Sequence, residues 1–372
     1  MAQKRVLVLH YEMKEGGRFV HDPVVDRVGD ALRACGHEAV PLPARSDVRE
    51  VIDALSGLRP DLVFNLCETF AAEDGFEIQV ASLLELCRVR FTGSGSQGLF
   101  LAFDKSIAKG LFVARGLPTP ASALSDAAHP DPDVSGLRFP LIVKPVASDA
   151  SLGIDADSLV HDEASLRRRV ARVRDEMRQD ALVEEFLDGR EFYVAVLGWP
   201  EPQALPPVEL NFSAVPPGSP RLVSRRAKWV ERSREHATMF SELARDLDPA
   251  LDRALRETAL EAVRAVRVQH YARVDLRLDA KGRPNILEVN PNPYLHPDSE
   301  FAMAAAAAGM DYDAMVGRIV DISLQREPRR RRMLVSPPES SPAVPSACIV
   351  PPAPAAAAAS AETRAEGVAP AP

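Results

Sequence analysis

The segment RVDLRLDAKGRPNILEVNPNP, residues 273–293, decides the fold, because it contains two apolar runs on either side of a turn with glycine. Side chains two residues apart share one face of a strand, so Arg273 and Asp275 point the same way, as do Glu288 and Asn290. The opposite face would carry Val274, Leu276, Leu278, Leu287 and Val289. A hairpin of these strands would bring two carboxylates, an amide and a guanidinium onto one patch.

Oxygen ligands of this kind suit Mg²⁺, which prefers carboxylates, water and phosphate oxygens and seldom has a cage made by protein alone. A nucleotide would then supply the remaining ligands. The alternative is a solvated sheet face on which aspartate and arginine form cross-strand pairs, each contributing about 0.2–1 kcal/mol. The NPNP loop at 290–293 follows the predicted ligands directly, which favours a site.

A second polar group is predicted upstream, where FPLIVKP places Lys144 at the end of an apolar strand. Pro145 cannot continue an interior ladder, so the ammonium group should leave the sheet at an edge or a cleft. The small residues that follow, including Ser148 and Ser151, offer N–H groups and hydroxyls suited to covering a phosphate. Gly153 permits a positive φ or a close approach. The alternative is a lysine that reaches solvent beside an ordinary turn.

Two further segments could complete a nucleotide site. Lys105 and Lys109 in FDKSIAK are one turn apart on a predicted helix, although most such lysines are simply solvated. Glu184 ends the apolar part of LVEEF, and a turn at 187–190 leads to Glu191 and the strand FYVAVLG. A strand edge can present backbone groups to adenine while a carboxylate accepts from ribose hydroxyls. Glu191 could equally pair with a neighbouring arginine or lysine.

Length and composition limit the class of protein. A chain of 372 residues exceeds one hydrophobic core, so we expect two or three subdomains, and a formal charge of -8 argues against a nucleic-acid surface. The four cysteines form no CxxC pair, as is typical of a reducing compartment. No stretch is apolar and long enough to cross a bilayer, and the N-terminus lacks a signal-peptide core. We therefore expect a soluble, cytoplasmic protein.

The chain is predicted to have an α/β and α+β architecture. Residues 1–102 alternate short apolar runs with helical periodicity, which predicts a Rossmann-like domain with a parallel sheet. Residues 103–198 and 199–326 contain strands separated by glycine-containing turns. This predicts two α+β subdomains with antiparallel hairpins, one of them formed by LVEEFLDGREFYVAVLG. Residues 327–372 are rich in proline and alanine, so we expect them to be disordered.

Taken in order, these pieces resemble the ATP-grasp fold and, more closely, the D-alanine–D-alanine ligase family. The resemblance covers about residues 61–299, roughly two-thirds of the chain. Any one of its segments could arise by chance, but their common order is specific. The segments are EDG (73–75), FTGSGSQGLFLAFDKSIAK (91–109), RGLPTP (115–120), FPLIVKP (139–145), VEEFLDGREF (183–192), RAKW (226–229), RVDLRL (273–278) and ILEVNPNP (286–293).

The resemblance implies a set of residues that would hold ATP: Lys105, Lys144, Ser148, Ser151, Gly153, Glu184, Phe186, Leu187 and Glu191. Among these, the two lysines would contact the phosphates, and the small-residue loop would close over the γ-phosphate. Glu184 would hold adenine together with the backbone at 186 and 187, and Glu191 would bind ribose.

The resemblance also implies catalytic and metal-binding residues. Asp275, Glu288 and Asn290 match the family's magnesium ligands. In the family the residue at the position of Glu288 bridges two magnesium ions, and Mn²⁺ could take the place of Mg²⁺. Arg273 matches an arginine beside the reacting phosphate and carbonyl groups, and Lys228 matches a lysine on the loop that closes over ATP. The implied activity is ATP-dependent joining of a small carboxylate to an amine through an acyl phosphate. Relatives are commonly dimers, which raises the hypothesis of a homodimer.

The substrate-binding segments depart from the family. HYEMKEGGRF replaces the glycine-rich first loop, with Glu12 as a loose substitute for the family's glutamate. Glu68 stands where the family has a histidine and would favour an ammonium group. Tyr294 stands where the family has a glycine, which changes the pocket size, and Ser299 could line the same pocket. We predict substrates other than two D-alanines; the alternatives are an authentic D-alanine–D-alanine ligase and an inactive ATP-binding regulatory module.

Overall fold

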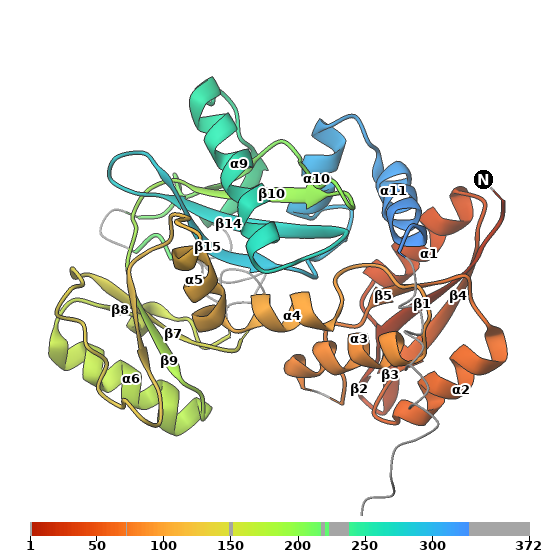
Figure 1. The fold of residues 1–372 in the computed structure, drawn as a ribbon, viewed down its shortest axis with the longest axis horizontal. Coiled ribbons are helices and arrows are strands. Elements are labelled where there is room, and N and C mark those ends of the chain that lie inside the picture. The colour runs from red at the N-terminus through yellow and green to blue at the C-terminus, as the bar shows by residue number, and fades with distance from the viewer. Residues whose placement is uncertain (1, 72, 149–151, 217–219, 223–237, 327–372) are drawn as a thin grey trace, which may run out of the picture. The chain divides into compact units, whose positions relative to one another are not determined.

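The computed structural model describes residues 2–326 apart from 72, 149–151, 217–219 and 223–237 (Figure 1). The predicted site residues Ser151 and Lys228 and the predicted tail at 327–372 lie outside the described residues. Among the helices that the structure describes, none is long and apolar enough to span a membrane.

The N-terminal part is a parallel sheet with strand order β4-β1-β5 and helices on both faces, as the sequence predicted. Its elements are β1 (Arg5–Tyr11), α1 (Val24–Ala34), β4 (Glu38–Ala44), α2 (Val48–Leu58), β5 (Leu62–Leu66), the short 3-10 helix η1 (Asp74–Phe76) and α3 (Glu77–Leu86). Val6 and Val8 of β1 pack in the cluster with α1, whereas Leu7 and Leu9 pack in the cluster with α2 and α3. Both faces of the sheet are therefore buried, and ligands of such sheets bind at the carboxyl ends of the strands.

A short hairpin follows β1 that we did not expect from the sequence. β2 (Met13–Glu15) and β3 (Arg18–Val20) pair in antiparallel register around Gly16 and Gly17. A Gly-Gly pair between two short runs is a known hairpin signal. The runs are too short and too polar to stand out as strands in the sequence.

The middle of the chain forms a four-stranded antiparallel sheet with order β6-β9-β7-β8, covered by one long helix (Figure 1). Its elements are β6 (Ser122–Ser125), β7 (Leu141–Pro145), η2 (Ala156–Ser158), β8 (Leu159–Val160), α6 (Glu163–Met177) and β9 (Ala181–Glu185). Leu141 and Val143 pack against α6, whereas Ile142 and Lys144 line a cleft on the other face. The helices α4 (Ser96–Phe103) and α5 (Lys105–Ala114) precede this sheet.

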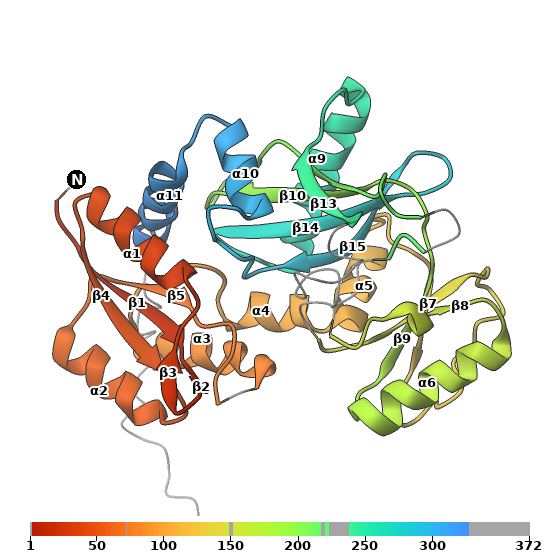
Figure 2. The same cartoon turned by 180° about the vertical axis from the view of Figure 1, so that it is seen from behind.

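The C-terminal part is a six-stranded sheet with order β13-β12-β10-β14-β15, in which β11 also pairs with β10 (Figure 2). Its elements are β10 (Glu191–Leu197), β11 (Gln203–Ala204), β12 (Val208–Asn211), β13 (Phe240–Leu243), α9 (Pro249–Ala265), β14 (Tyr271–Leu278), β15 (Pro284–Asn290), α10 (Glu300–Ala307) and α11 (Tyr312–Leu324). Phe192 and Val194 of β10 pack in the cluster with α9, whereas Tyr193 and Ala195 pack in the cluster with α10. The polar residues of β14 and β15 lie within this two-sided packing.

The expected hairpin between β9 and β10 was wrong. β9 pairs with β6 and β7 in the four-stranded sheet, and β10 pairs with β12 and β14 in the six-stranded sheet. Each strand already has neighbours on both sides, so neither has a free edge for the other. The link at 186–190 therefore passes from one sheet to the other, and β10 groups with the C-terminal strands and not with residues 103–190.

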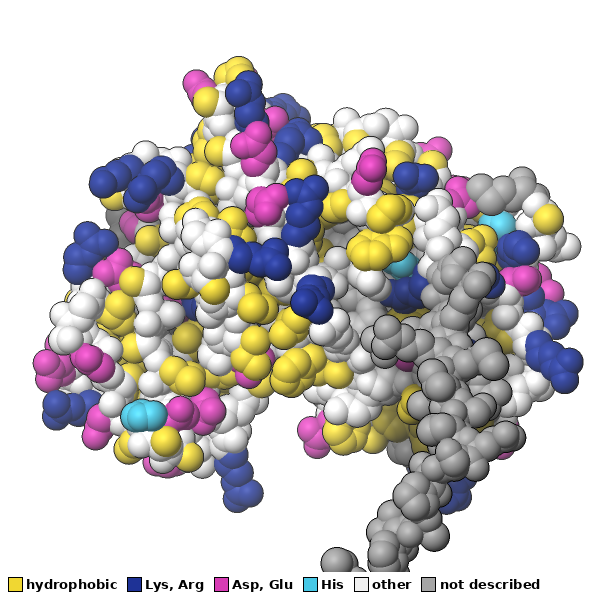
Figure 3. Space-filling model, in the orientation of Figure 1, with side chains coloured by type: hydrophobic (Ala, Val, Ile, Leu, Met, Phe, Trp, Pro, Cys, Tyr) yellow, Lys and Arg dark blue, Asp and Glu magenta, His cyan; other side chains and the backbone are white. Residues whose placement is uncertain are grey.

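Charged side chains of both signs are interspersed over the described residues of the face in Figure 3. Exposed pairs such as Arg172 with Glu176, 3.0 Å apart, are local to one helix. Pairs of this kind contribute about 0.3–0.5 kcal/mol each. The charges that define a functional site must therefore be sought among buried groups.

Candidate functional site

The hairpin of β14 and β15 brings the predicted metal ligands together. In its antiparallel register Asp275 pairs directly with Glu288, and Arg273 pairs with Asn290. Residues that oppose each other in this way point to the same face, with Cβ atoms about 4.5–5.5 Å apart. The prediction that these four side chains share one face is confirmed.

A β-bulge between Asp275 and Leu276 corrects one detail of that prediction. Beyond the bulge Leu276 pairs with Ile286, so Leu287 is the extra residue of β15. Ile286 is fully buried in the core, whereas Leu287 lines the same cleft as Glu288. The prediction that Leu287 lies opposite Glu288 was wrong, because strict alternation holds only in an unbroken ladder.

The guanidinium of Arg273 is held rigidly beside Asp275, one of the predicted metal ligands. It donates to both oxygens of Asp275 at 2.8 and 3.0 Å, and its Nη1 lies 3.3 Å from Glu300 Oε2. It also stacks on the Tyr193 ring, 4.7 Å from the centroid. Burial alone would lower the pKa of Arg273, but Asp275 and Glu300 raise it well above its ordinary value. The result is a fixed cation of the kind that stabilises a developing oxyanion.

A buried ion triad joins α5 to the four-stranded sheet. Glu184 lies 2.8 Å from Lys109 Nζ and 2.7 Å from Lys144 Nζ, and its side chain is 1% exposed. Burial alone would raise the pKa of Glu184, but the two lysines lower it to about 2. Burial lowers the pKa of Lys109, while Glu184 outweighs burial at Lys144 and raises the pKa there. Lys109 is therefore part of the site, and its role was not predicted.

Lys105 connects Glu288, a predicted metal ligand, to the small-residue loop. Its Nζ donates to the backbone oxygen of Ser148 and lies 3.8 Å from Glu288 Oε2. Gly153 has φ +74, and a Cβ there would collide with Pro145 and with the methionine that ends α6. The expectation of a positive φ and a close approach at Gly153 is confirmed.

Arg277 is a buried residue of the site that we did not predict. Its Nη1 lies 3.2 Å from Glu191 Oε2, and its Nη2 donates to the backbone oxygen of Arg221 at 2.7 Å. Its guanidinium stacks on Phe186, 5.0 Å from the ring centroid. Residue 277 shares its strand face with 273 and 275, as the sequence indicates. Its direct pairing with Glu191 across β14 and β10, which the sequence does not indicate, places it among the predicted adenine and ribose contacts.

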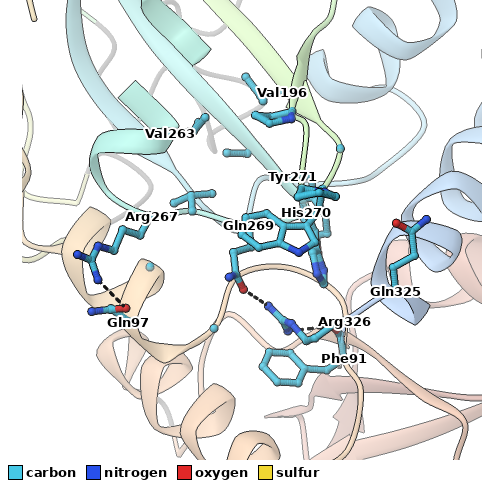
Figure 4. Close-up of a pocket in the computed structure, with 18 of the residues that line it drawn as sticks. Phe91, Gln97, Val196, Val263, Arg267, Gln269, His270, Tyr271, Gln325 and Arg326 are labelled. Atoms are coloured by element: carbon cyan, nitrogen blue, oxygen red, sulfur yellow. Dashed lines mark hydrogen bonds between the residues drawn. The ribbon is translucent and has the colours of Figure 1, made fainter. Parts of the chain in front are cut away.

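Most of these groups line one cleft between the two larger sheets, but Lys109, Gly153, Arg273 and Asn290 are not among the residues that line it. The predicted residues that line it are Lys105, Lys144, Ser148, Glu184, Phe186, Leu187, Glu191, Asp275 and Glu288. A larger cavity of about 610 Å³ lies elsewhere, where Arg267 bonds to Gln97 and Arg326 to Gln269 (Figure 4). Of the predicted site residues in the described part of the chain, none lines that cavity. Chemistry, not size, therefore identifies the cleft as the candidate site.

The predicted substrate residues lie in two different settings. The Tyr294 hydroxyl donates to Asp22 Oδ1 at 2.8 Å, and burial followed by Asp22 raises its pKa. The charge of Glu68 also raises the pKa of this hydroxyl. Ser299 instead caps α10, where its Oγ accepts from the backbone N–H of Ala302 at 3.2 Å. Its place in a substrate pocket stays a prediction.

The donors of the cleft fit a nucleotide with Mg²⁺. Asp275 and Glu288 offer carboxylate oxygens on one face, and Asn290 follows two residues later on that face. Lys105 and Lys144 supply ammonium groups that could meet phosphate oxygens. Three oxygen donors beside two lysines form a site suited to a metal-bound polyphosphate.

Comparison with known proteins identifies the family. A family model described as the D-ala D-ala ligase C-terminus matches residues 120–321. The protein y4sG of Sinorhizobium fredii is 35% identical over 310 residues, which are 82% of this chain and 88% of that protein. The D-alanine–D-alanine ligase of Stutzerimonas stutzeri is 34% identical over 299 residues, 79% of this chain and 87% of that protein.

A solved structure gives the same answer for the fold. The D-alanine–D-alanine ligase of Bacillus anthracis, crystallised in complex with ATP, has a TM-score of 0.66 and 21% sequence identity, over 86% of this chain and 97% of that chain. The segment matched by the family model includes the four-stranded sheet, β10, and the hairpin of β14 and β15. The fold is thus the ATP-grasp fold, and the chain belongs to the D-alanine–D-alanine ligase family.

Proposed function

We propose that this protein is an ATP-dependent ligase that uses Mg²⁺ and joins a carboxylate to an amine in the cytoplasm. The observation that carries the proposal is the direct pairing of Asp275 with Glu288 in one cleft with Lys105, Lys144 and Glu191. Phosphoryl transfer depends on positioning and on charge neutralisation, and these residues offer both.

The proposed reaction has two steps. A carboxylate oxygen of the first substrate attacks the γ-phosphorus of ATP, which gives an acyl phosphate and releases ADP. The amine of the second substrate attacks the acyl carbon, loses a proton and displaces phosphate. Mg²⁺, when bound, supplies charge neutralisation at the phosphate oxygens.

The side chains of the cleft have separate tasks in this reaction. Lys105 and Lys144 would hold phosphate oxygens, and Asp275, Glu288 and Asn290 would hold the metal ion. The fixed guanidinium at residue 273 would stabilise the oxyanion formed on the acyl carbon. Loss of one such donor typically costs about 10²–10³ in rate.

We propose substrates other than a pair of D-alanines. The Tyr294 hydroxyl bonds to Asp22, and the charge of Glu68 raises the pKa of the same hydroxyl. The family resemblance implies that Tyr294 and Glu68 lie in substrate pockets. A bulky ring and two carboxylates favour a substrate that carries an ammonium group. The alternatives are an authentic D-alanine–D-alanine ligase and an ATP-binding module without catalysis.

A coupled assay of ADP release over pairs of amino acids and small carboxylic acids tests the proposal. ADP release that requires both a carboxylate and an amine supports it. Dipeptide formation from D-alanine alone would show that the protein is an authentic D-alanine–D-alanine ligase. ATP binding without turnover across the whole panel would show that the protein is an ATP-binding regulatory module and not a ligase.

Ser151 and Lys228 would complete the cover over ATP, and Glu288 would bridge two metal ions. We propose domain boundaries at residues 102 and 326. The boundary first placed at residue 198 moves to the start of β10, because β10 belongs to the C-terminal sheet. A homodimer, proposed from the family resemblance, is tested by light scattering of the purified chain.

A further inference from the structure

Two histidines and a glutamate converge at the carboxyl end of β1, outside the nucleotide cleft. His10 and Glu12 are two residues apart at the end of this strand, and His21 follows β3. One ligand atom from each side chain lies within 4.8 Å of the others. His10 Nε2 lies 3.9 Å from Glu12 Oε1, and the two imidazole rings meet edge to face with centroids 5.2 Å apart.

Neighbouring groups bond to the atoms of His10 and Glu12 that point away from the cluster. His10 is 2% exposed, and its Nδ1 lies 2.9 Å from the backbone oxygen of Val8. That contact assigns the proton to Nδ1 and leaves Nε2 with a lone pair. Glu12 Oε2 accepts from Arg45 Nε at 2.9 Å, and Arg45 is itself stacked on Phe19. Oε1 of Glu12 is the oxygen that faces His10.

His21 has a carboxylate partner of its own. Its Nε2 lies 3.3 Å from Asp26 Oδ2 at the start of α1. Histidines that bind metals usually give their other ring nitrogen to a carboxylate or a backbone carbonyl, which fixes the ring and its tautomer. His10 has the carbonyl partner and His21 the carboxylate partner, so both match this pattern.

A plain polar cluster is the competing interpretation. It accounts for the contacts of His10 with Val8, of Glu12 with Arg45 and of His21 with Asp26. It does not explain why one ligand atom from each of the three side chains lies within 4.8 Å of the others. The cluster contains two carboxylates, Glu12 and Asp26, and one guanidinium, that of Arg45. Its net charge with neutral histidines is therefore negative. The cluster thus suits a cation electrostatically.

The donor types favour a transition metal over Mg²⁺ or Ca²⁺. Imidazole nitrogen suits ions such as Zn²⁺, with metal–nitrogen distances of about 2.0–2.1 Å. Ligand atoms around a tetrahedral ion of that size are roughly 3.3 Å apart, so the 3.9 Å between His10 and Glu12 must shorten slightly. His21 sits beside the exposed β2–β3 hairpin and is the ligand that can move most easily.

We propose that His10, Glu12 and His21 bind a divalent transition-metal ion of the Zn²⁺ class, with at least one coordination position open. The site lies at the carboxyl end of a parallel sheet, where such sheets bind ligands. Asp22, which follows His21 directly in the chain, accepts the hydrogen bond from Tyr294, so the chain passes from the proposed metal site to a contact of a proposed substrate residue. Metal binding itself does not depend on the proposed ligase activity.

Spectroscopic titration of the metal-free, full-length protein with Co²⁺ tests the proposal. Cobalt held by two imidazoles and a carboxylate gives visible ligand-field bands, and Zn²⁺ should displace it with loss of those bands. His21→Ala should weaken Co²⁺ affinity at least about tenfold, and Asp26→Asn by about tenfold through the imidazole. His129→Ala is the matched control, because His129 pairs with Asp126 at 3.2 Å but belongs to no such cluster among the residues that the structure describes.

A second control separates this site from the magnesium ligands. Glu288→Gln should leave the cobalt bands unchanged, and the thermal melt of each variant checks its fold. Wild-type protein without saturable Co²⁺ or Zn²⁺ binding would overturn the proposal. Equal affinity in His21→Ala and wild type would do so as well, as would bands that vanish in Glu288→Gln alone. Failure of ligase activity in any variant has no bearing on these results.

Discussion

The buried triad of Lys109, Glu184 and Lys144 leads to a prediction that can be made quantitative. Glu184→Gln keeps the shape of the side chain but removes the carboxylate that directly pairs with both interior ammonium groups. The carboxylate is 1% exposed and lies 2.8 and 2.7 Å from the two lysine nitrogens. Removal of one partner from such a buried group costs about 3–5 kcal/mol.

The next residue along β9 provides a matched control. Glu185 pairs with Arg138 at 2.9 Å, but the arginine side chain is 86% exposed. An exposed pair contributes about 0–1 kcal/mol. At about 2 °C per kcal/mol for a large domain, Glu184→Gln should lower the calorimetric Tm by about 6–10 °C and Glu185→Gln by no more than about 2 °C.

The pH dependence of stability follows from the sign of the pKa shift. The pKa of Glu184 is lowered from an ordinary value of 4.5 to about 2 in the folded protein. A carboxyl group with a lowered pKa stabilises the folded state above its unfolded pKa, and this stabilisation is lost as the pH falls through the folded pKa. The difference in stability between wild type and Glu184→Gln should therefore be full at neutral pH and shrink from about pH 4.5 toward pH 2.

Two results would refute this reasoning. Equal decreases of Tm in Glu184→Gln and Glu185→Gln would show that burial does not determine how much the triad contributes to the stability of the folded protein. A difference that stays constant down to pH 2 would show that ionisation of Glu184 is not involved. Lys109→Met added to Glu184→Gln should recover part of the loss, because one unpaired charge is removed.

Three other substitutions test the cleft and its surroundings. Glu288→Gln should reduce Mg²⁺-dependent ADP release at least about 10²-fold with an unchanged melting curve, and retained activity would remove Glu288 from the metal site. Arg277→Met should raise the KM for ATP about tenfold with a smaller change in kcat, since its ion pair with Glu191 is lost; an unchanged KM would place ATP elsewhere. Tyr294→Gly should alter the substrate profile in the ADP-release panel more than ATP affinity, because it removes a ring bonded to Asp22. An unaltered profile would show that this ring does not face the pocket.

The parts of the fold that the sequence predicted well are those with strong local periodicity. The parallel N-terminal sheet followed from apolar runs that alternate with helices, and the β14–β15 hairpin followed from a turn between two alternating strands. Asp275 and Glu288 were placed on one face because a strand offers only two faces. The family resemblance added the lysines, whose individual signals were weak.

The errors arose where long-range pairing decides the outcome. The segment 182–197 looked like a hairpin, yet its two strands joined different sheets because each found partners far away in the chain. The bulge that turned Leu287 into the cleft leaves no mark in the local pattern. Lys109 and Arg277 had ordinary sequence contexts, and only burial beside Glu184 and Glu191 reveals their part in the site.

The link at 186–190 has a mechanical consequence. It ties β9 of one sheet to β10 of the other, and Gly189 is seated so closely on Leu278 that a Cβ there would strike the carbonyl oxygen of that residue. A base resting on this link, as proposed for adenine, would therefore contact the short segment that joins β9 to β10, and an added Cβ at residue 189 should shift that segment and weaken binding of the base.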